Sequence, residues 1–319
     1  MNTSFFLRSK KPILLLGFLF FVQNIIAQDQ PETFSDLADL KYVNVSESVI
    51  MLQNDKKYGS NIVCVALDDG LVFFDCSLFK SRAYRFRKDM EEKFNKSTLA
   101  LVLTHSHIDH IMGMDAFADL PIISCNASQP LIEQQLQINF EQYVEGYKSV
   151  FSEFDEALKD YRLFMPNVWF DKEIILGSGN LKIIIRNTGG HSICSSYGYF
   201  EKESILIAGD NLQAEYHPYF GDRTGNMPVW IETLQSWERM NITYFCPGHG
   251  PKVNMNYLTD TRLFFEDLYN ILVELKKNNT PVEEVIKYDK FPVGYWPKEL
   301  EKPGWYDPSL AFIYNSIVL

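Results

Sequence analysis

The sequence predicts an α/β fold, in which short apolar strands alternate with helical segments. The first observation is a pair of apolar runs, at 62–67 and 71–74, that flank Asp68-Asp69-Gly70 and predict a β-hairpin. The second is the charged stretch 83–94, which predicts a helix before the apolar run at 99–103. The third is that strand-like runs recur in the second half of the chain, at 173–176, 181–187, 195–200, 203–208 and 242–246.

The stretch 104–110, Thr-His-Ser-His-Ile-Asp-His, directly follows one of these predicted strands and is rich in metal-ligating groups. His105 and His107 are two residues apart, so at the end of an extended strand they point to the same side. Asp109 and His110 follow at once. Imidazole and carboxylate groups suit zinc, iron or manganese, and two such ions would make hydroxide available at neutral pH.

Three further potential ligands lie in similar surroundings later in the chain. His191, Asp210 and His249 each come after a short apolar run and directly follow a glycine. Small neighbours let the backbone come close to an ion or a substrate. Five of the six histidines of the chain belong to these motifs, which favours a metal site over scattered structural histidines.

In this order, the motifs resemble those of the metallo-β-lactamase superfamily. The resemblance rests on His-x-His-x-Asp-His at 105–110, followed by His191, Asp210 and His249, and it extends over roughly 49–273. It implies an αββα sandwich, in which two mixed sheets pack face to face between outer helices. The metals of such a fold lie at one edge, between the sheets.

The resemblance also implies which residues hold which ion. The first ion would be held by His105, His107 and His191, the second by Asp109, His110 and His249, and Asp210 would bridge both. Zinc is the expected metal, with iron and manganese as alternatives. Asp109 would be the catalytic residue, because it would orient the hydroxide that the two ions share and accept its proton.

The residue at position 210 bears on the substrate. The resemblance implies that one lactamase subclass has a cysteine ligand where this chain has Asp210, whereas thioesterases, lactonases, phosphodiesterases and sulfatases of the superfamily have a bridging aspartate. We therefore expect a hydrolase of small esters, lactones, thioesters or amides. β-Lactam hydrolysis is the alternative within this class, and a non-haem iron oxidoreductase of the same fold is the alternative outside it.

Thr104, Ser192 and Asn211 each lie next to a potential ligand. They are candidates for holding the imidazoles in position, since metal-bound histidines usually donate their second ring N–H to a neighbour. Plain turn or capping residues are the alternative reading.

Residues 1–27 have the pattern of a secretory signal peptide. Arg8, Lys10 and Lys11 precede the apolar run 12–22, and we expect cleavage after Ala27. The run is short for a membrane span of about 20 residues. A secreted or periplasmic protein without a stable membrane anchor is therefore expected, and an uncleaved anchor is the alternative.

Composition limits the partners. The net charge of −11 repels polyanions, so we expect a small-molecule substrate and no nucleic acid. Five cysteines are few and odd in number for a secreted disulfide scaffold, and we expect Cys194 and Cys246 to be core thiols. A homo-oligomer is compatible with the sequence.

Residues 28–290 are expected to form the catalytic domain, with a helical insertion at about 128–163. The segment 258–277 predicts an amphipathic helix, and 281–288 predicts another with Thr280 as its N-cap. The C-terminal extension 291–319 is too aromatic for a disordered tail, so we expect it to pack on the domain or on a second subunit.

Two segments supply candidate substrate contacts. Tyr143 and Tyr147 belong to an aromatic stripe in the insertion, whose helical spacing predicts either packing onto the body or a lid over the metals. His217 and Tyr219 lie shortly after Asp210, in a segment that we expect to form a second wall of the site.

Overall fold

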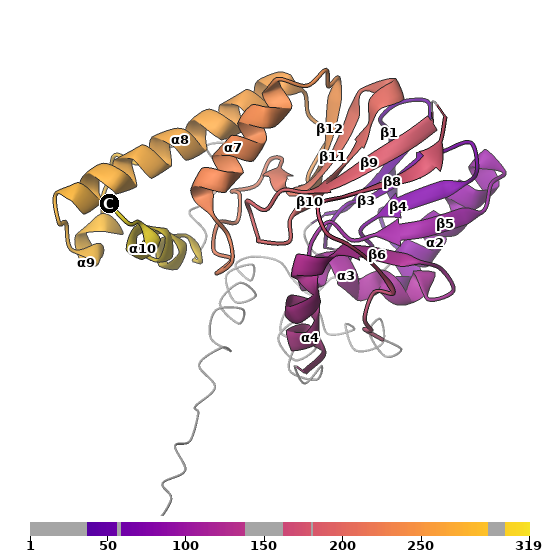
Figure 1. Cartoon of the computed structure of the whole chain (residues 1–319), viewed down its shortest axis with the longest axis horizontal. Coiled ribbons are helices and arrows are strands. Elements are labelled where there is room, and N and C mark those ends of the chain that lie inside the picture. The colour runs from indigo at the N-terminus through magenta and orange to yellow at the C-terminus, as the bar shows by residue number, and fades with distance from the viewer. Residues whose placement is uncertain (1–36, 56–58, 138–161, 180, 293–303) are drawn as a thin grey trace, which may run out of the picture.

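Two β-sheets pack face to face between helices, which confirms the αββα sandwich expected from the sequence (Figure 1). The protein is described by a computed structural model, which covers residues 37–55, 59–137, 162–179, 181–292 and 304–319. The signal-peptide prediction for 1–27, and Tyr143 and Tyr147, lie outside the described residues.

The first sheet has seven strands that follow one another in sequence order. They are β1 (Lys41–Asn44), β2 (Val49–Gln53), β3 (Ile62–Ala66), β4 (Leu71–Phe74), β5 (Thr98–Val102), β6 (Ile122–Cys125) and β7 (Val168–Phe170). The predicted β3–β4 hairpin is confirmed, with Ala66 opposite Leu71. From β4 onward the strands are parallel, and helix α2 (Lys80–Phe94) connects β4 to β5.

The second sheet has five strands in the order β12-β11-β10-β9-β8. They are β8 (Glu173–Ser178), β9 (Leu181–Asn187), β10 (Ser196–Phe200), β11 (Ile205–Gln213) and β12 (Tyr244–His249). The strand expected at 203–208 begins and ends later in the structure, at Ile205 and Gln213. Residues 201–203 form a 3₁₀ turn that Ser204 ends in a left-handed conformation, and the strand runs on to Gln213. Helix α7 (Met227–Glu238) connects the parallel strands β11 and β12.

Alternate side chains of the first sheet enter two different cores. Ile62 and Cys64 pack with α2 on the outer side, whereas Val63 and Val65 face the second sheet. This division follows from the two-residue period of a strand, and burial of both faces explains the continuous apolar runs in the sequence. A third core lies between the second sheet and the helices α7, α8 (Met255–Lys277) and α10 (Tyr306–Ser316).

The C-terminal part of the chain differs from the prediction in one helix. Only α9 (Val282–Val285) forms within 281–288, and Pro281 rather than Thr280 occupies its N-cap. The carbonyl of Thr280 instead accepts a hydrogen bond from the Tyr314 hydroxyl of α10, because α10 packs back onto the domain.

The predicted helical insertion is described only at its two ends. Helix α4 (Gln129–Gln137) forms its first part. Residues 162–166 already have no regular structure, so the helical stretch does not reach 163. The next described strand, β7, extends the first sheet.

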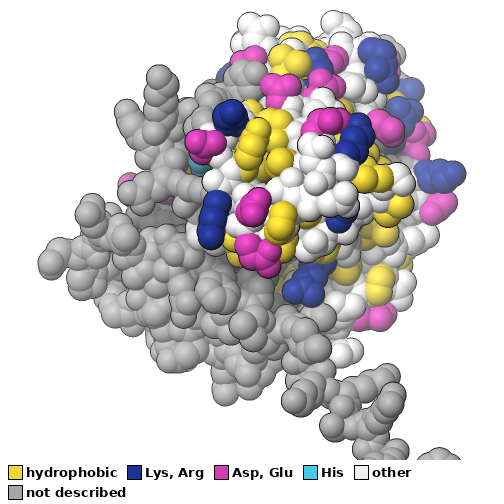
Figure 2. Space-filling view, turned by 90° about the vertical axis from the view of Figure 1, so that its left-hand side faces the viewer, with side chains coloured by type: hydrophobic (Ala, Val, Ile, Leu, Met, Phe, Trp, Pro, Cys, Tyr) yellow, Lys and Arg dark blue, Asp and Glu magenta, His cyan; other side chains and the backbone are white. Residues whose placement is uncertain are grey.

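All five cysteines are buried and free of disulfides, and Cys194 and Cys246 lie in the core between the sheets, as expected. Figure 2 shows acidic and basic side chains interspersed with apolar ones over the described part of one face. Among the described residues, no helix combines the length and apolar character that crossing a membrane requires.

We expect Arg82→Ala to lower the free energy of unfolding by about 3 kcal/mol or more, because charged hydrogen bonds inside the fold would be lost. The Arg82 guanidinium is fully buried and donates to Asn54 Oδ1 and to the Ala38 carbonyl. Arg85→Ala is the control on the same helix, since Arg85 is exposed and pairs only across one turn with Asp89. Urea unfolding compares the two, and equal losses would contradict this account.

Candidate metal centre

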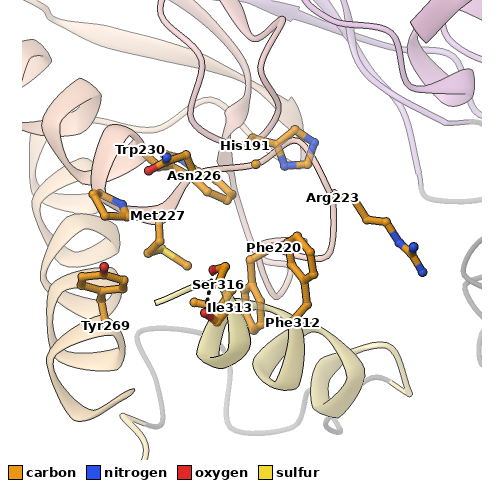
Figure 3. Close-up of a pocket in the computed structure, with 12 residues that line it drawn as sticks. His191, Phe220, Arg223, Asn226, Met227, Trp230, Tyr269, Phe312, Ile313 and Ser316 are labelled. Atoms are coloured by element: carbon orange, nitrogen blue, oxygen red, sulfur yellow. Dashed lines mark hydrogen bonds between the residues drawn. The ribbon is translucent and has the colours of Figure 1, made fainter. Parts of the chain in front are cut away.

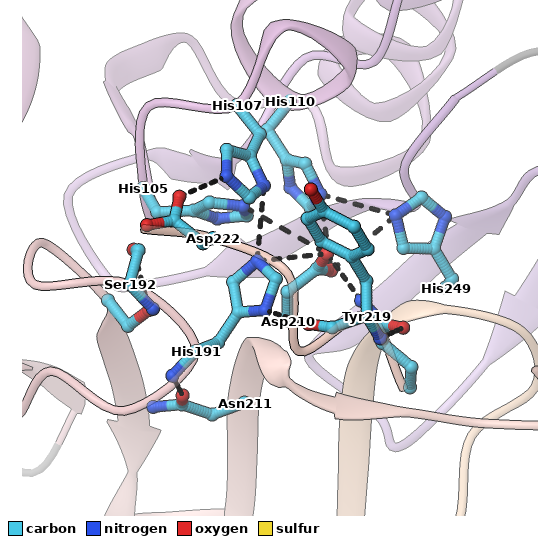
Figure 4. A network of polar contacts seen from close by, with 12 residues as sticks. His105, His107, His110, His191, Ser192, Asp210, Asn211, Tyr219, Asp222 and His249 are labelled. Carbon is cyan, nitrogen blue, oxygen red and sulfur yellow. Dashed lines mark hydrogen bonds and ion pairs between the residues drawn. The ribbon is translucent and has the colours of Figure 1, made fainter. Parts of the chain in front are cut away.

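The ligands predicted from the sequence converge at one edge of the sandwich, and both sheets contribute (Figure 4). From the first sheet come the loop after β5, with His105 and His107, and the short helix α3 (Ile108–Ile111). From the second sheet come the loop after β9, the middle of β11 and the end of β12.

Two groups of ligand atoms form there. One comprises His105, His107, His191 and Asp210, and the other comprises Asp109, His110 and His249. Within each group, the potential ligand atoms lie within 4.8 Å of one another. The grouping is the one that the family resemblance implied.

Asp210 lies between the two groups, with one carboxylate oxygen toward each. Its Oδ2 is 3.6 Å from His191 Nε2 and 4.0 Å from His105 Nε2. Its Oδ1 is 3.2 Å from His110 Nε2 and 3.5 Å from His249 Nε2. This is the arrangement required of a carboxylate that bridges two ions.

Asp75 orients the imidazole of His110 directly and that of His105 through Thr104, on the side away from the ligand cluster. His110 Nδ1 donates to Asp75 Oδ2 at 2.7 Å, which leaves Nε2 toward the centre. The Thr104 hydroxyl donates to the same oxygen at 2.8 Å and lies 3.1 Å from His105 Nδ1. It can therefore accept a hydrogen bond from His105 Nδ1, so both rings turn Nε2 inward, where it can ligate an ion.

The segment after β11 orients the other two imidazoles of the first group. His191 Nδ1 donates to the Tyr219 carbonyl at 2.8 Å. His107 Nε2 donates to Asp222 Oδ2 at 2.6 Å, so His107 presents Nδ1, 3.1 Å from His191 Nε2. The half-buried Asp222 carboxyl keeps a pKa well below its usual range because its contacts outweigh the effect of burial, above all the bond from His107.

Thr104, Ser192 and Asn211, which the sequence suggested as partners of the imidazoles, have different contacts. Thr104 contacts an imidazole, as expected of a residue that holds a ligand in position. Asn211 acts on the backbone, because its Oδ1 accepts from His191 N at 2.9 Å. Ser192 contacts no imidazole and instead closes a turn with Ser195.

Two glycines are required by close approaches. A Cβ on Gly248 would lie 2.0 Å from Asp210 Oδ1, so no larger residue fits there without displacing the bridging carboxylate. Gly209 has φ of +53° beside an irregularity in the β11–β12 pairing. Asp210 therefore lies within a bulged strand, whereas the sequence suggested that it follows one.

Without metal, individual residues of the site differ in proton affinity. Burial and the neighbouring imidazoles of His107 and His110 lower the pKa of His191 to about 4. Burial also lowers the pKa of His249, but Asp210 and Asp109 outweigh it and raise that pKa to about 9. Burial would raise the pKa of Asp109, yet His110 and His249 lower it to about 2.

The residues present fit a pair of divalent ions. His105 Nε2 and Asp210 Oδ1 are buried and have no hydrogen-bond partner among the described residues. Leaving such atoms unsatisfied is costly, and both point at positions where an ion would be ligated. The donors are imidazoles and carboxylates, which suit zinc, iron and manganese.

The two described substrate-contact candidates lie differently. The ring of Tyr219 lies 6.0 Å from the rings of both His107 and His191, centroid to centroid, so it borders the first group (Figure 4). The ring of His217 instead packs against Tyr306 of α10, with the ring centroids 5.9 Å apart.

The sequence assigned no ligand-orienting role to Asp75, Asp222 or Gln213, although Asp222 ends the segment expected as a second wall of the site. Gln213 Nε2 donates to Asp210 Oδ2 at 2.6 Å, and its Oε1 accepts from Tyr219 N. Asp75 directly follows strand β4, and several predicted ligands also follow a strand directly. Its position in the sequence could therefore have indicated its role. Asp222 and Gln213 had no such indication, because their contacts depend on how the segment after β11 folds.

Fold and site together are those of a metal-dependent hydrolase. The chain belongs to the metallo-β-lactamase superfamily: a sequence model described as "Metallo-beta-lactamase superfamily" matches residues 56–249, more than half of the chain. A "Metallo-beta-lactamase type 2" from Elizabethkingia meningoseptica is 22% identical over 168 residues. That match spans 49% of this chain and 65% of the relative, just under two thirds of its length.

Solved structures share the fold at low identity. A metallo-beta-lactamase from Pontibacter korlensis has a TM-score of 0.57 at 17% identity, and the match covers 72% of this chain and 99% of that one. The stereoselective inverting sec-alkylsulfatase Pisa1 from Pseudomonas sp. has a TM-score of 0.60 at 17% identity, with 86% of this chain and 50% of that chain covered.

Asp222→Ala should weaken Zn²⁺ binding about 10- to 100-fold, since His107 would lose the carboxylate that orients its ring. Competition with a chromophoric chelator measures this. Asp171→Ala, which removes an exposed carboxylate that belongs to neither ligand group, is the control. Unchanged Zn²⁺ affinity in Asp222→Ala would show that the His107–Asp222 bond does not position the ligand.

Zn²⁺ affinity is expected to rise with pH up to about 9, by about tenfold per unit for each displaced proton. In the metal-free protein the pKa of His249 is about 9 rather than the ordinary 6.5, so an ion must displace its proton at neutral pH. The protonated form stabilises the metal-free fold below about pH 6.5, and this contribution is lost as pH rises through about 9. Chelator competition and proton release measured between about pH 6 and 9 test the trend; a flat profile would refute it.

Proposed function

We propose that the protein is a dinuclear metal hydrolase that acts on a small ester, lactone, thioester or amide, with Zn²⁺ as the physiological metal. The observation that carries the proposal is the Asp210 carboxylate, which turns one oxygen toward each ligand group. A bridging carboxylate serves a pair of ions rather than a single one.

The two aspartates of the site have different exposure, which separates their roles. The Asp210 side chain is 5% exposed and is enclosed by imidazoles. The Asp109 side chain is 24% exposed, and its Oδ2 lies 3.2 Å from His249 Nε2. With a pKa of about 2, Asp109 is ionised at neutral pH, so it can accept a hydrogen bond from an incoming water and orient it.

Tyr219 provides a donor beside the first group. Burial raises its pKa to about 12, with Asp222 adding to the effect, so its hydroxyl keeps its proton at neutral pH. Such a hydroxyl can donate to a substrate oxygen. The same residue orients His191 through its carbonyl, so substrate contact and ligand geometry are coupled.

When bound, the ions would supply Lewis acidity and would lower the pKa of water to about 7. The chain supplies the rest. Asp75, Asp222 and the Tyr219 carbonyl fix the imidazoles, and Asp109 orients the water. No serine or cysteine nucleophile is required.

We infer a secreted or periplasmic location from the pattern of residues 1–27. A small-molecule substrate agrees with the acidic composition, and a homo-oligomer stays compatible with it.

A substrate panel tests the proposal. Zinc-loaded and chelator-treated protein would be compared on an ester, a lactone, a thioester, an amide, a β-lactam and a sec-alkyl sulfate. The last two are included because similar proteins are named metallo-beta-lactamase and sec-alkylsulfatase. We expect metal-dependent hydrolysis of the acyl substrates to exceed that of the β-lactam. Turnover of the β-lactam alone, or stoichiometric iron with oxygen uptake, would overturn the proposal.

Asp109→Ala should reduce kcat/KM on the hydrolysed substrate by about 10²-fold or more, because the water loses the carboxylate that orients it. Asp109→Asn keeps a ligand oxygen but no charge, and should reduce kcat more than it changes KM. Metal content and thermal unfolding of both variants separate this from loss of metal or fold. Asp267→Ala, an exposed carboxylate on α8, is the control. Wild-type rates in Asp109→Ala would refute the assignment.

A further inference from the structure

The side chain of Gln213 connects the bridging carboxylate to the segment 214–222, which follows β11. Gln213 is the last residue of β11 and is 5% exposed. Its Nε2 donates to Asp210 Oδ2 at 2.6 Å, and its Oε1 accepts from Tyr219 N at 3.0 Å. A backbone N–H can only donate and an ionised carboxylate can only accept, so the two partners require a donor at one end of the side chain and an acceptor at the other.

A bulge in β11 makes the contact between Gln213 and Asp210 possible. The two residues are three apart, so on a regular strand their side chains would point to opposite faces. The pairing of β11 with β12 shifts its register between Gly209 and Gln213, and Gly209 has φ of +53°. An irregularity of this kind redirects the side chains of the strand. It thereby brings the Gln213 amide to the side of the Asp210 carboxylate.

The backbone at Gln213 is held separately from its side chain. Ala214 N donates to the His249 carbonyl at 2.9 Å, at the end of β12. The Tyr257 hydroxyl of α8 donates to the Gln213 carbonyl at 3.2 Å and accepts from Glu215 N at 3.0 Å. These bonds use only main-chain atoms of residues 213–215, so a change of the Gln213 side chain leaves them in place.

Two of the four ligands in the first group depend on the Gln213 amide. It holds Asp210 through Oδ2, the oxygen that lies 3.6 Å from His191 Nε2. It also holds the main chain at Tyr219, whose carbonyl accepts from His191 Nδ1 at 2.8 Å. The contacts form a closed ring, from Asp210 through Gln213, Tyr219 and His191 back to the same oxygen. Loss of the amide would therefore loosen both ligands.

Packing encloses His191 only in part. Its ring lies 5.4 Å from that of Trp230, centroid to centroid, and both residues border a cavity of about 230 Å³ (Figure 3). A residue at the wall of a cavity lacks contacts on that side. Hydrogen bonds therefore have a large part in orienting the ring, and Nδ1 makes its bond to the Tyr219 carbonyl.

The second ligand group is oriented from the other sheet. His110 Nδ1 donates to Asp75 Oδ2 at 2.7 Å, and Asp75 directly follows β4 of the first sheet. The Asp210 oxygen that faces this group is Oδ1, 3.2 Å from His110 Nε2, whereas Gln213 donates to Oδ2. The contacts of the Gln213 amide thus lie on the side of the first group.

We propose that Gln213 is a positioning residue that sets the affinity of the first ligand group for its ion and leaves that of the second group nearly unchanged. Neighbours that hydrogen-bond to a ligand commonly change metal affinity about 10- to 100-fold. The inference rests on the two-ion site of the proposed function, but it does not require that any substrate is hydrolysed. It names the side chain that decides whether the protein holds one ion or two when zinc is limiting.

Single-site variants separate the two positions. His249→Ala removes a ligand of the second group, and His191→Ala removes one of the first. Gln213→Met is then introduced into each, because methionine is also unbranched but its thioether cannot donate and accepts only weakly. Gln235→Met is the matched control, since the half-buried Gln235 amide donates to Glu266 between α7 and α8. Competition with a chromophoric chelator measures the Zn²⁺ affinity of each protein.

Gln213→Met should weaken Zn²⁺ binding by about tenfold or more in the His249→Ala protein, and by less than about threefold in the His191→Ala protein. Gln235→Met should change neither affinity. A purely structural role of Gln213 would lower the temperature of unfolding without distinguishing the two positions. Equal weakening in both proteins, or none in either, would overturn the inference.

Cobalt provides a spectroscopic readout of the same variants, because the visible absorption of bound Co²⁺ depends on ligand geometry. Gln213→Met should shift the Co²⁺ bands of the His249→Ala protein, in which Asp210 and His191 would change orientation. The bands of the His191→Ala protein should stay the same. Unshifted bands in the first protein would contradict a positioning role.

The metal titrations and the substrate panel distinguish this inference from the proposed function. If the loss of affinity is selective but the zinc-loaded protein hydrolyses no substrate, the assignment of Gln213 stands and the proposed hydrolysis falls. If substrates are hydrolysed but Gln213→Met weakens both positions equally, the assignment falls and the proposed function stands.

Discussion

The metal centre depends on one buried carboxylate, that of Asp210, which lies between the two ligand groups. Both sheets contribute residues to these groups. Asp210 belongs to the second sheet, whereas His105 and His110 belong to the connection that follows β5 of the first. A carboxylate this deeply buried is costly unless opposite charges or metal ions compensate it. The site therefore exists only when the core between the sheets is formed, and the ligands in turn hold the two sheets together at that edge.

Hydrogen bonds behind the ligands decide which ring nitrogen each imidazole turns toward the centre. Asp75 and Asp222 each accept a hydrogen bond from the imidazole nitrogen that points away from the ligand cluster. This fixes which nitrogen of each ring faces the centre, where it can ligate an ion. His107 uses Nδ1 and its neighbours use Nε2, a difference that follows from which side the carboxylate occupies.

The C-terminal extension is coupled to these hydrogen bonds through aromatic packing. The ring of Phe220 lies 5.4 Å from Trp305 and 5.1 Å from Tyr306, and Tyr219 lies 5.2 Å from Trp305. These contacts stabilise the segment whose carbonyl and carboxylate orient His191 and His107.

From the sequence by itself came the alternation of strands and helices and the candidate ligands, because strand periodicity and ligand-bearing strand ends are local patterns, whereas the αββα layers were implied by the family resemblance that those motifs carry. Only the tertiary structure decided which groups serve the ligands. His107 and Asp222 are 115 residues apart, and no local spacing relates them. The same reason explains why Asp210 lies inside a bulged strand rather than after one. Packing between distant segments set these features.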